Sequence, residues 1–169
     1  MIVQTKNENF VQGVLFMKVR QFMTDGIEAL KPNETALTAS RLMKKCDIGS
    51  VPVIDESSQV VGIVTDRDIV VRVFADIMPM NTKVEEIMTH PVHTIVETAE
   101  VGEAISLMAD KQIRRLPVVD AQNKLVGMIS LADLAVHQLT DGRAEIALKE
   151  ISEPNTNPNL DLEVDDFPL

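Results

Sequence analysis

Aromatic side chains and basic charge are scarce in this chain of 169 residues. Tyr and Trp are absent, and five Phe make up the whole aromatic content of 3%. Proteins that bind single-stranded nucleic acid usually stack the bases on aromatic side chains. Lys and Arg number 16 against 26 Asp and Glu, whereas the surface of a nucleic-acid binder is usually basic. The composition therefore argues against nucleic acid as a partner.

Long apolar runs and paired cysteines are also missing. No run approaches the roughly 18 apolar residues of a transmembrane helix, and the N-terminus lacks the pattern of a secretory signal peptide. Cys46 is the single cysteine, so no internal disulfide can form, which fits a reducing compartment. We therefore expect a cytoplasmic protein without a membrane partner.

An internal repeat is the clearest pattern in the chain. Residues 18–72 align with residues 83–137 at a constant offset of 65, and identical pairs occur several times more often than chance gives. The best-matched segments are VRQFMT with VEEIMT, IGSVPVID with IRRLPVVD, and GIVTDRD with GMISLAD. The sequence therefore predicts two copies of one structural unit.

Each copy is expected to contain two helices. Small and apolar residues at positions i, i+3, i+4 and i+7 indicate helices over 35–45 and, in the second copy, over 100–111. Shorter helices are expected at the end of each copy, over 66–74 and 131–139. Together with the strands, these helices give each unit the order strand, helix, strand, strand, helix.

A β-hairpin lies between the two helices of each copy. In the first copy, the β-rich runs over 51–55 and 60–65 are joined by a short polar loop, and the second copy repeats this pattern. Proline cannot donate a backbone hydrogen bond to a sheet, so Pro52 and Pro117 predict an edge strand or a bulge. The expected fold class is α/β (α+β), a tandem pair built around small mixed sheets.

The chain divides into four expected segments. They are an N-terminal arm or mis-assigned start over 1–16, a first domain with its linker over 17–82, a second domain over 83–140, and a short helix with an acidic disordered tail over 141–169. A unit of about 60 residues is marginal alone, so the two copies are expected to share a core. Their remaining apolar surface, including some of the nine Met, predicts a homodimer, although Met is ordinarily core filler.

Both copies resemble cystathionine beta-synthase (CBS) domains, which typically occur as pairs. The resemblance covers residues 17–138 and rests on the opening VRQFMT and VEEIMT, the SVPVID and RLPVVD strands, and the closing GIVTDRD and GMISLAD. Within the family the chain is most similar to small stand-alone bacterial proteins with two CBS domains. The resemblance implies two clefts that bind adenosine-containing ligands such as AMP, ADP, ATP or S-adenosylmethionine. It leaves no room for a catalytic domain.

The resemblance also implies which side chains hold such a ligand. A hydroxyl and a carboxylate in the closing motif hold ribose or phosphate, and here they are Thr65 with Asp68 and Ser130 with Asp133. A carboxylate can accept from both hydroxyls of a ribose, at roughly 1.5–3 kcal/mol for each charged hydrogen bond. The same spacing also matches a helix capping box, and both roles can coexist.

Backbone positions complete the implied site. Backbone groups near Val51 and Leu116, one residue before each proline of the hairpins, typically meet the base in this family. Gly62 and Gly127 interrupt strand patterns, where a missing side chain often marks close approach by a ligand or by another backbone. We include all four positions among the candidate ligand-binding residues.

Arginine supplies the candidates for anionic groups, because its guanidinium suits phosphate. Arg67 lies in the closing motif of the first copy, and Arg114 and Arg115 precede a strand in the second. The aligned positions of the other copy hold no Arg, so the clefts are expected to differ in charge. If only one cleft takes a multiply phosphorylated ligand, we expect it to be the cleft nearer Arg114 and Arg115. The alternative is solvated Arg, or Arg paired with Asp47 or Asp110.

Metal and catalytic signatures are weak. His90 and His93 lie three residues apart without a third ligand nearby, so no metal site is expected. No nucleophile with its base and no phosphate-binding glycine loop is visible. Cys46 is expected to be inert and half-buried. We therefore do not expect an enzyme or a required cofactor.

Two functions remain open. The first is a sensor, in which an adenine nucleotide or related adenosyl ligand alters the geometry of the pair and thereby its contact with an unidentified protein partner. The alternative is a ligand-free scaffold for dimerisation or protein interaction. The two intact motifs that end in Asp68 and Asp133 favour the sensor.

Overall fold

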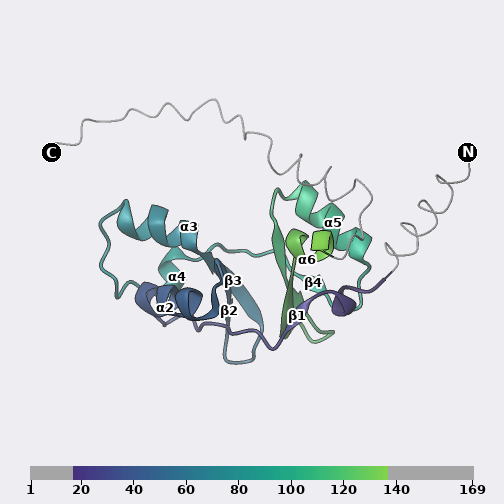
Figure 1. The fold of residues 1–169 in the computed structure, drawn as a ribbon. Helices are drawn as coiled ribbons and strands as arrows, with labels where there is room; N and C mark the ends of the chain where they lie inside the picture. Colours follow the sequence, from purple (N-terminus) through teal and green to yellow (C-terminus); the bar gives the residue numbers. More distant parts are fainter. Residues whose placement is uncertain (1–16, 137–169) are drawn as a thin grey trace, which may run out of the picture.

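Residues 17–136 are described by a computed structural model, in which two α/β units lie side by side (Figure 1). The expected N-terminal arm, C-terminal helix and acidic tail fall outside the described residues. Helices and small sheets form both units, and the sheet of the second unit is mixed, so the expected fold class is confirmed. The division of the chain into 17–82 and 83–140 stays a prediction.

The first unit is built from a helix, a hairpin and a second helix, as the repeat predicts. Its elements are α2 (Ala36–Cys46), β2 (Ser50–Ile54), β3 (Val60–Thr65), α3 (Asp66–Ile69) and the π-helical continuation η2 (Val70–Phe74). The Thr35 hydroxyl starts α2 by accepting a hydrogen bond from the Thr38 amide at 3.2 Å. Asp47, in the left-handed conformation, ends the helix.

The second unit repeats this order with a fuller sheet. Its elements are β4 (Ile95–Val96), α5 (Val101–Asp110), β5 (Arg115–Val119), β6 (Leu125–Ser130) and α6 (Leu131–Val136). The four strands lie in the order β1-β6-β5-β4, with β4 parallel and β6 antiparallel to β5. The strand β1 of this sheet comes from the start of the chain.

The opening segment of each repeat packs onto the other unit. β1 (Thr24–Asp25) is antiparallel to β6, with Thr24 opposite Met128. Reciprocally, Thr89 follows α4 (Val84–Ile87) and exchanges two backbone hydrogen bonds with Ile63 of β3, at 2.8 and 3.2 Å. Figure 1 shows α4 beside α2 and α3, and β1 in the unit of α5 and α6. The two repeats are therefore interlocked.

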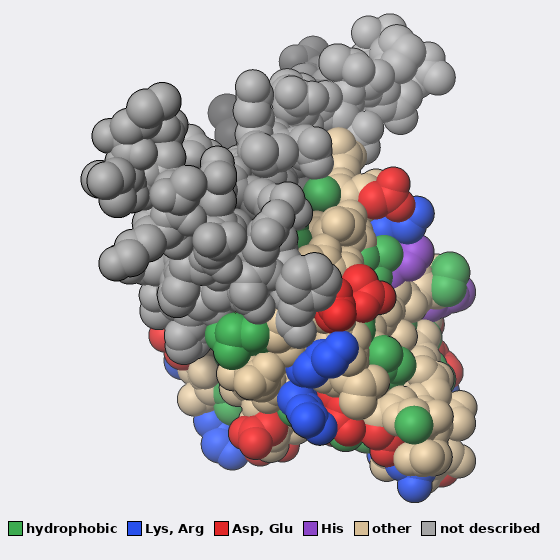
Figure 2. All heavy atoms as spheres, turned by 90° about the vertical axis from the view of Figure 1, so that its right-hand side faces the viewer, with side chains coloured by type: hydrophobic (Ala, Val, Ile, Leu, Met, Phe, Trp, Pro, Cys, Tyr) green, Lys and Arg blue, Asp and Glu red, His purple; other side chains and the backbone are tan. Residues whose placement is uncertain are grey.

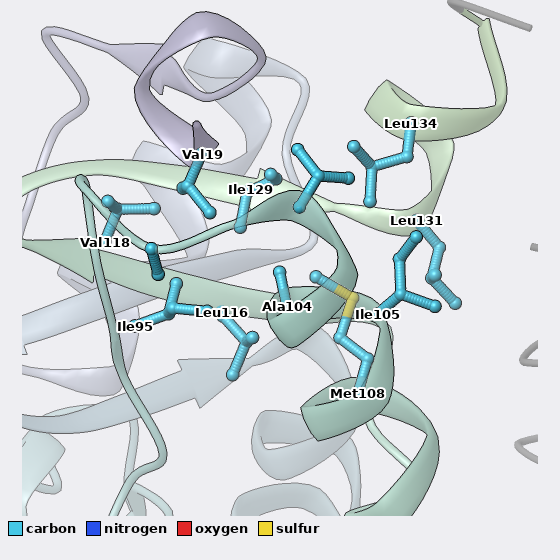
Figure 3. Packing of buried hydrophobic residues seen from close by; sticks show 12 residues of the cluster. Val19, Ile95, Ala104, Ile105, Met108, Leu116, Val118, Ile129, Leu131 and Leu134 are labelled. Atoms are coloured by element: carbon cyan, nitrogen blue, oxygen red, sulfur yellow. The ribbon is translucent and has the colours of Figure 1, made fainter. Parts of the chain in front are cut away.

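The exchange extends into the hydrophobic cores. Val19, in the short 3-10 helix η1 (Val19–Gln21), is fully buried in the second unit's core, whose packing is shown in Figure 3. Val84 and Ile87 are fully buried in the first unit's core. Burial of such a side chain contributes about 1.5–3 kcal/mol. Two cores with exchanged segments therefore take the place of the single shared core that was expected.

Neither hairpin proline has to donate a backbone hydrogen bond to a neighbouring strand. The Pro52 carbonyl accepts a hydrogen bond from the Leu30 amide at 2.9 Å. Because the nitrogen and carbonyl of a strand residue point to the same side, the Pro52 nitrogen also faces this outer edge of β2. Pro117 lies in an interior strand, so the edge alternative is wrong there, but β4 pairs with β5 only from Val118 onward. In both hairpins the register shifts just after the proline, at Val53 and Val118.

Two strand glycines allow the opening segments to approach. A Cβ on Gly127 would lie 2.5 Å from the backbone oxygen of Thr24, and a Cβ on Gly62 would lie 2.4 Å from the sulfur of Met88. Side chains at these positions would therefore collide with the exchanged segments. The second contact involves a flexible side chain, whereas the first involves the backbone of β1.

Alanine substitutions at these two glycines are expected to differ in cost. Gly127→Ala must displace β1 and is expected to lower the free energy of unfolding by about 1–3 kcal/mol. Gly62→Ala needs only a rotation of Met88 and is expected to cost clearly less. Urea unfolding followed by far-ultraviolet circular dichroism measures both. Equal destabilisation by the two substitutions would contradict the interlocked arrangement.

Candidate functional site

Two clefts open where the units meet, one at the end of β3 and one at the end of β6. The Thr65 cleft has a volume of about 360 Å³, and the Ser130 cleft has a volume of about 300 Å³. Each is named here for the hydroxyl residue that it contains. Both clefts draw their walls from both repeats, because the opening segments cross between the units.

The lining of the two clefts follows the repeat. Each combines the end of a closing strand, the loop after an opening segment, and the residues before a hairpin. The Thr65 cleft is lined by Gly49, Ile63, Thr65, Asp66, Arg67, Asp68, Thr89, Pro91, Val92, His93, Gln112, Ile113, Arg114, Arg115 and Pro117. The Ser130 cleft is lined by Thr24, Ile27, Glu28, Asp47, Ile48, Gly49, Ser50, Pro52, Arg115, Met128, Ser130 and Asp133.

The hydroxyl and carboxylate of the first closing motif form a capping box. One Asp68 carboxylate oxygen, Oδ2, accepts from the Thr65 amide at 2.8 Å and from the Thr65 hydroxyl at 2.7 Å. The hydroxyl in turn accepts from the Asp68 amide at 3.2 Å. The other oxygen, Oδ1, lies 3.4 Å from the Arg72 guanidinium. The capping alternative is therefore realised in a carboxylate that also lines the cleft.

The second closing motif repeats this geometry. Asp133 Oδ2 accepts from the Ser130 amide at 2.8 Å and from the Ser130 hydroxyl at 2.7 Å. The capping box fixes each carboxylate at the mouth of a helix and leaves its remaining lone pairs able to accept further hydrogen bonds. Both motifs therefore present a rigid acceptor to their clefts.

The structure brings all three candidate arginines into one cleft. Arg67 and the pair Arg114 and Arg115 come from different repeats, and the sequence suggested that they serve different clefts. In the structure they all line the Thr65 cleft, and Arg115 lines the Ser130 cleft as well. The exchange of segments explains this, because it places the second repeat's pre-hairpin residues opposite the first repeat's closing motif.

Pairing of these arginines with Asp47 or Asp110 is not found within residues 17–136. The guanidinium of Arg115 donates to the Ser50 hydroxyl at 2.7 Å. Asp110 instead contacts Lys111 at 2.7 Å, and that hydrogen bond and positive charge lower the pKa of the Asp110 carboxyl. Figure 2 shows Lys and Arg lying among Asp and Glu on the described part of one face.

Four of the sequence candidates do not line either cleft with a side chain. Val51 and Leu116 are fully buried, but the residues on both sides of each line a cleft, so their backbone runs along the wall. Gly62 and Gly127 lie against Met88 and Thr24. Approach by another chain segment, which the sequence left open, therefore accounts for both glycines.

Sequence reasoning did not predict the lining residues that each cleft receives from the opposite repeat. His93 and Gln112 line the Thr65 cleft, and the residues at the same offset of 65, Glu28 and Asp47, line the Ser130 cleft. Repeat alignment marks these positions as equivalent. It does not reveal that they face the closing motif of the other copy.

The remaining sequence candidates lie outside this chemistry. Cys46 is exposed, so the expected half-buried position is wrong. Among residues 17–136, His, Cys, Asp and Glu form no group of three that could hold a metal ion. No helix in the same range is long and apolar enough to cross a membrane.

Comparison with known proteins agrees with the fold and the repeat. A CBS domain model matches residues 19–74 and again residues 84–139. The CBS domain-containing protein YhcV of Bacillus subtilis (strain 168) is 40% identical over 137 residues, which are 81% of this chain and 96% of that protein.

Solved structures agree as well. The crystal structure of CBSX2 in complex with AMP gives a TM-score of 0.63 at 28% identity, covering 72% of this chain and 96% of that one. The CBS domain pair of protein MJ0100, in complex with 5′-methylthioadenosine and S-adenosyl-L-methionine, gives 0.62 at 28% identity, covering 73% and 96%. Because the CBS domain model matches more than half of this chain, the chain belongs to the CBS domain family and carries two copies of the domain.

Proposed function

We propose that this chain is a regulatory module that binds an adenosine-containing ligand, such as AMP, ADP, ATP or S-adenosylmethionine, in its clefts. The observation that carries the proposal is the pair of clefts, each with a fixed hydroxyl and carboxylate at its wall. The module acts in the cytoplasm as a binding protein and not as an enzyme. It requires no cofactor and no metal, and it acts without nucleic acid or membrane.

The chemistry of the Thr65 cleft suits such a ligand. The Asp68 carboxylate can accept from ribose hydroxyls, and Arg67, Arg114 and Arg115 can donate to phosphate. Apolar wall residues, such as Ile63 and Ile113, offer an aliphatic surface to the base. This matters because the chain has no Tyr or Trp on which the base could stack. The complexes of CBSX2 with AMP and of MJ0100 with adenosyl compounds support this ligand class.

The position of the clefts suits a sensor. A ligand in the Thr65 cleft touches the closing motif of one repeat and the pre-hairpin residues of the other. Its affinity therefore depends on how the repeats sit relative to each other, and by linkage its binding shifts that geometry. An unidentified protein partner binds the surface of the module, and its affinity changes with the geometry of the repeats.

A homodimer is part of the proposal. Val70, Val71, Phe74 and Ile77 expose 58%, 49%, 63% and 91% of their surface around η2. Exposed apolar clusters of this kind mark contact sites. The four side chains are uncharged, and the charges of Arg72 and Asp76 in the same segment are opposite in sign, so two copies can pack together without net repulsion. Within residues 17–136, Met80 is the one exposed Met, so the Met residues serve mainly as core filler.

A ligand-free scaffold is the second candidate function. It is supported by the same apolar cluster and by the capping boxes, which satisfy Thr65 and Asp68 without any ligand. In that case the clefts would result only from the way the repeats pack and would bind no ligand, and the apolar cluster alone would serve the function.

Thermal shift with a ligand panel separates the two functions. AMP, ADP, ATP, S-adenosylmethionine and cyclic dinucleotides are added singly, and at least one adenosine compound is expected to raise the melting temperature. Asp68→Asn retains an oxygen that can accept the capping hydrogen bonds but loses the charge. We expect it to weaken ligand binding in the Thr65 cleft about tenfold or more.

A matched substitution outside the clefts serves as the control. Glu56→Gln, the corresponding change of carboxylate to amide at an exposed position away from the apolar cluster, is expected to leave the ligand-induced shift unchanged. Absence of a shift with every compound on the unsubstituted chain would contradict the sensor and favour the scaffold.

Replacing an apolar residue of the exposed cluster tests the dimer. Phe74→Asp places a charge in the centre of the contact and is expected to weaken association at least tenfold. Size-exclusion chromatography with light scattering measures the mass of both forms. Val96→Asp, at a similarly exposed apolar site in the other unit, is the control and should remain dimeric. A monomeric unsubstituted chain, or a dimeric Phe74→Asp, would contradict the assignment.

A further inference from the structure

The two clefts have the same construction but opposite charge. Three Arg and two Asp line the Thr65 cleft. Within residues 17–136, one Arg lines the Ser130 cleft, against the three carboxylates of Glu28, Asp47 and Asp133. Phosphate is favoured in the first setting and repelled in the second, because unit charges a few ångströms apart interact appreciably even near a surface.

The difference is concentrated at positions that are equivalent in the two repeats. Glu28 in the Ser130 cleft corresponds to His93 in the Thr65 cleft, and Asp47 corresponds to Gln112. Asp47 and Gln112 share the left-handed backbone, with φ of 53° and 52°. The fold therefore supports either side chain at this position, and the choice of a carboxylate determines the charge of the cleft.

The one Arg among the described residues of the Ser130 cleft is also shared. Arg115 lines both clefts, and its guanidinium donates to Ser50, its own equivalent in the first repeat, at 2.7 Å. One guanidinium cannot face phosphates in two clefts at once. A phosphate in the Thr65 cleft therefore competes for the one cationic side chain that residues 17–136 contribute to the Ser130 cleft.

We propose that the Ser130 cleft takes an adenosine-type ligand without phosphate, either neutral or cationic, whereas the Thr65 cleft takes the phosphorylated ligand. This inference rests on the proposed function, since it assigns a ligand class to each cleft. Glu28 and Asp47 are the specificity-determining residues, because they repel phosphate and attract a cationic group beside the nucleoside.

Isoleucine methyl NMR tests the assignment one cleft at a time. Ile63 and Ile113 line the Thr65 cleft, and Ile27 and Ile48 line the Ser130 cleft. Labelling the δ1 methyl groups with carbon-13 gives reporters for both clefts in one sample, and single Ile→Val substitutions assign the signals. The probes are AMP, adenosine and S-adenosylmethionine.

AMP is expected to shift the methyl signals of Ile63 and Ile113 first. The signals of Ile27 and Ile48 should respond only at about tenfold higher AMP concentration or above. Adenosine and S-adenosylmethionine should shift Ile27 and Ile48 at concentrations where AMP does not. AMP acting on all four signals at the same concentration would overturn the inference but leave the proposed function intact. No response to any of these probes, nor to ADP or ATP, would overturn the proposed function itself.

Transplanting residues from one cleft to the other tests the cause. The double variant Glu28→His with Asp47→Gln gives the Ser130 cleft the side chains that the Thr65 cleft has at these two positions. It should lower the AMP concentration needed to shift Ile27 and Ile48 about tenfold and leave the adenosine response unchanged. Glu56→Gln with Glu85→Gln removes as many charges at exposed positions outside both clefts and should change neither. An unchanged AMP response in the transplanted cleft would overturn the role of Glu28 and Asp47.

Discussion

The pairing of each repeat's opening segment with the other repeat's closing strand is the contact on which the rest of the structure depends. Thr24 lies on β6 and Thr89 lies on β3, and the glycines at 127 and 62 leave the space for this approach. Val19 and Val84 then bury themselves in the opposite cores. Neither repeat can complete its sheet and core without the other, so the chain folds as an interlocked pair.

The same pairing creates the clefts. The chain continues from Thr89 to His93 along the Thr65 cleft and from Thr24 to Glu28 along the Ser130 cleft. Every cleft therefore contains a closing motif from one repeat and crossing residues from the other. A ligand that binds there joins two parts of the interlock, which is how binding can influence the surface that a partner contacts. Divergence between the repeats then determines which ligand each cleft prefers.

Local patterns in the sequence were sufficient for the elements and for part of the site. Helical periodicity predicted α2 and α5, and the repeat predicted both hairpins. The spacing of Thr65 and Asp68 predicted the capping box that the structure contains. These features depend on neighbours in the chain, so a single sequence carries their signal.

Contacts between the repeats could not be predicted from these local patterns. An offset of 65 shows which residues are equivalent but not which residues meet, so Arg67 was separated from Arg114 and Arg115 although one cleft contains all three. The strand glycines signalled a close approach without naming the approaching segment. An edge strand or a bulge was expected at Pro117 because proline cannot donate to a sheet. The interior position was not foreseen, because β4 has only two residues and little pattern of its own.

A crystal structure of the chain grown with AMP tests the central claim most directly. The interlocked, asymmetric clefts predict AMP in the Thr65 cleft, with its ribose hydroxyls on Asp68 and its phosphate facing the Arg67 and Arg114 side of the wall. They also predict that the Ser130 cleft excludes AMP. Electron density for AMP in the Ser130 cleft with the Thr65 cleft empty, or AMP bound outside both clefts, would contradict the account.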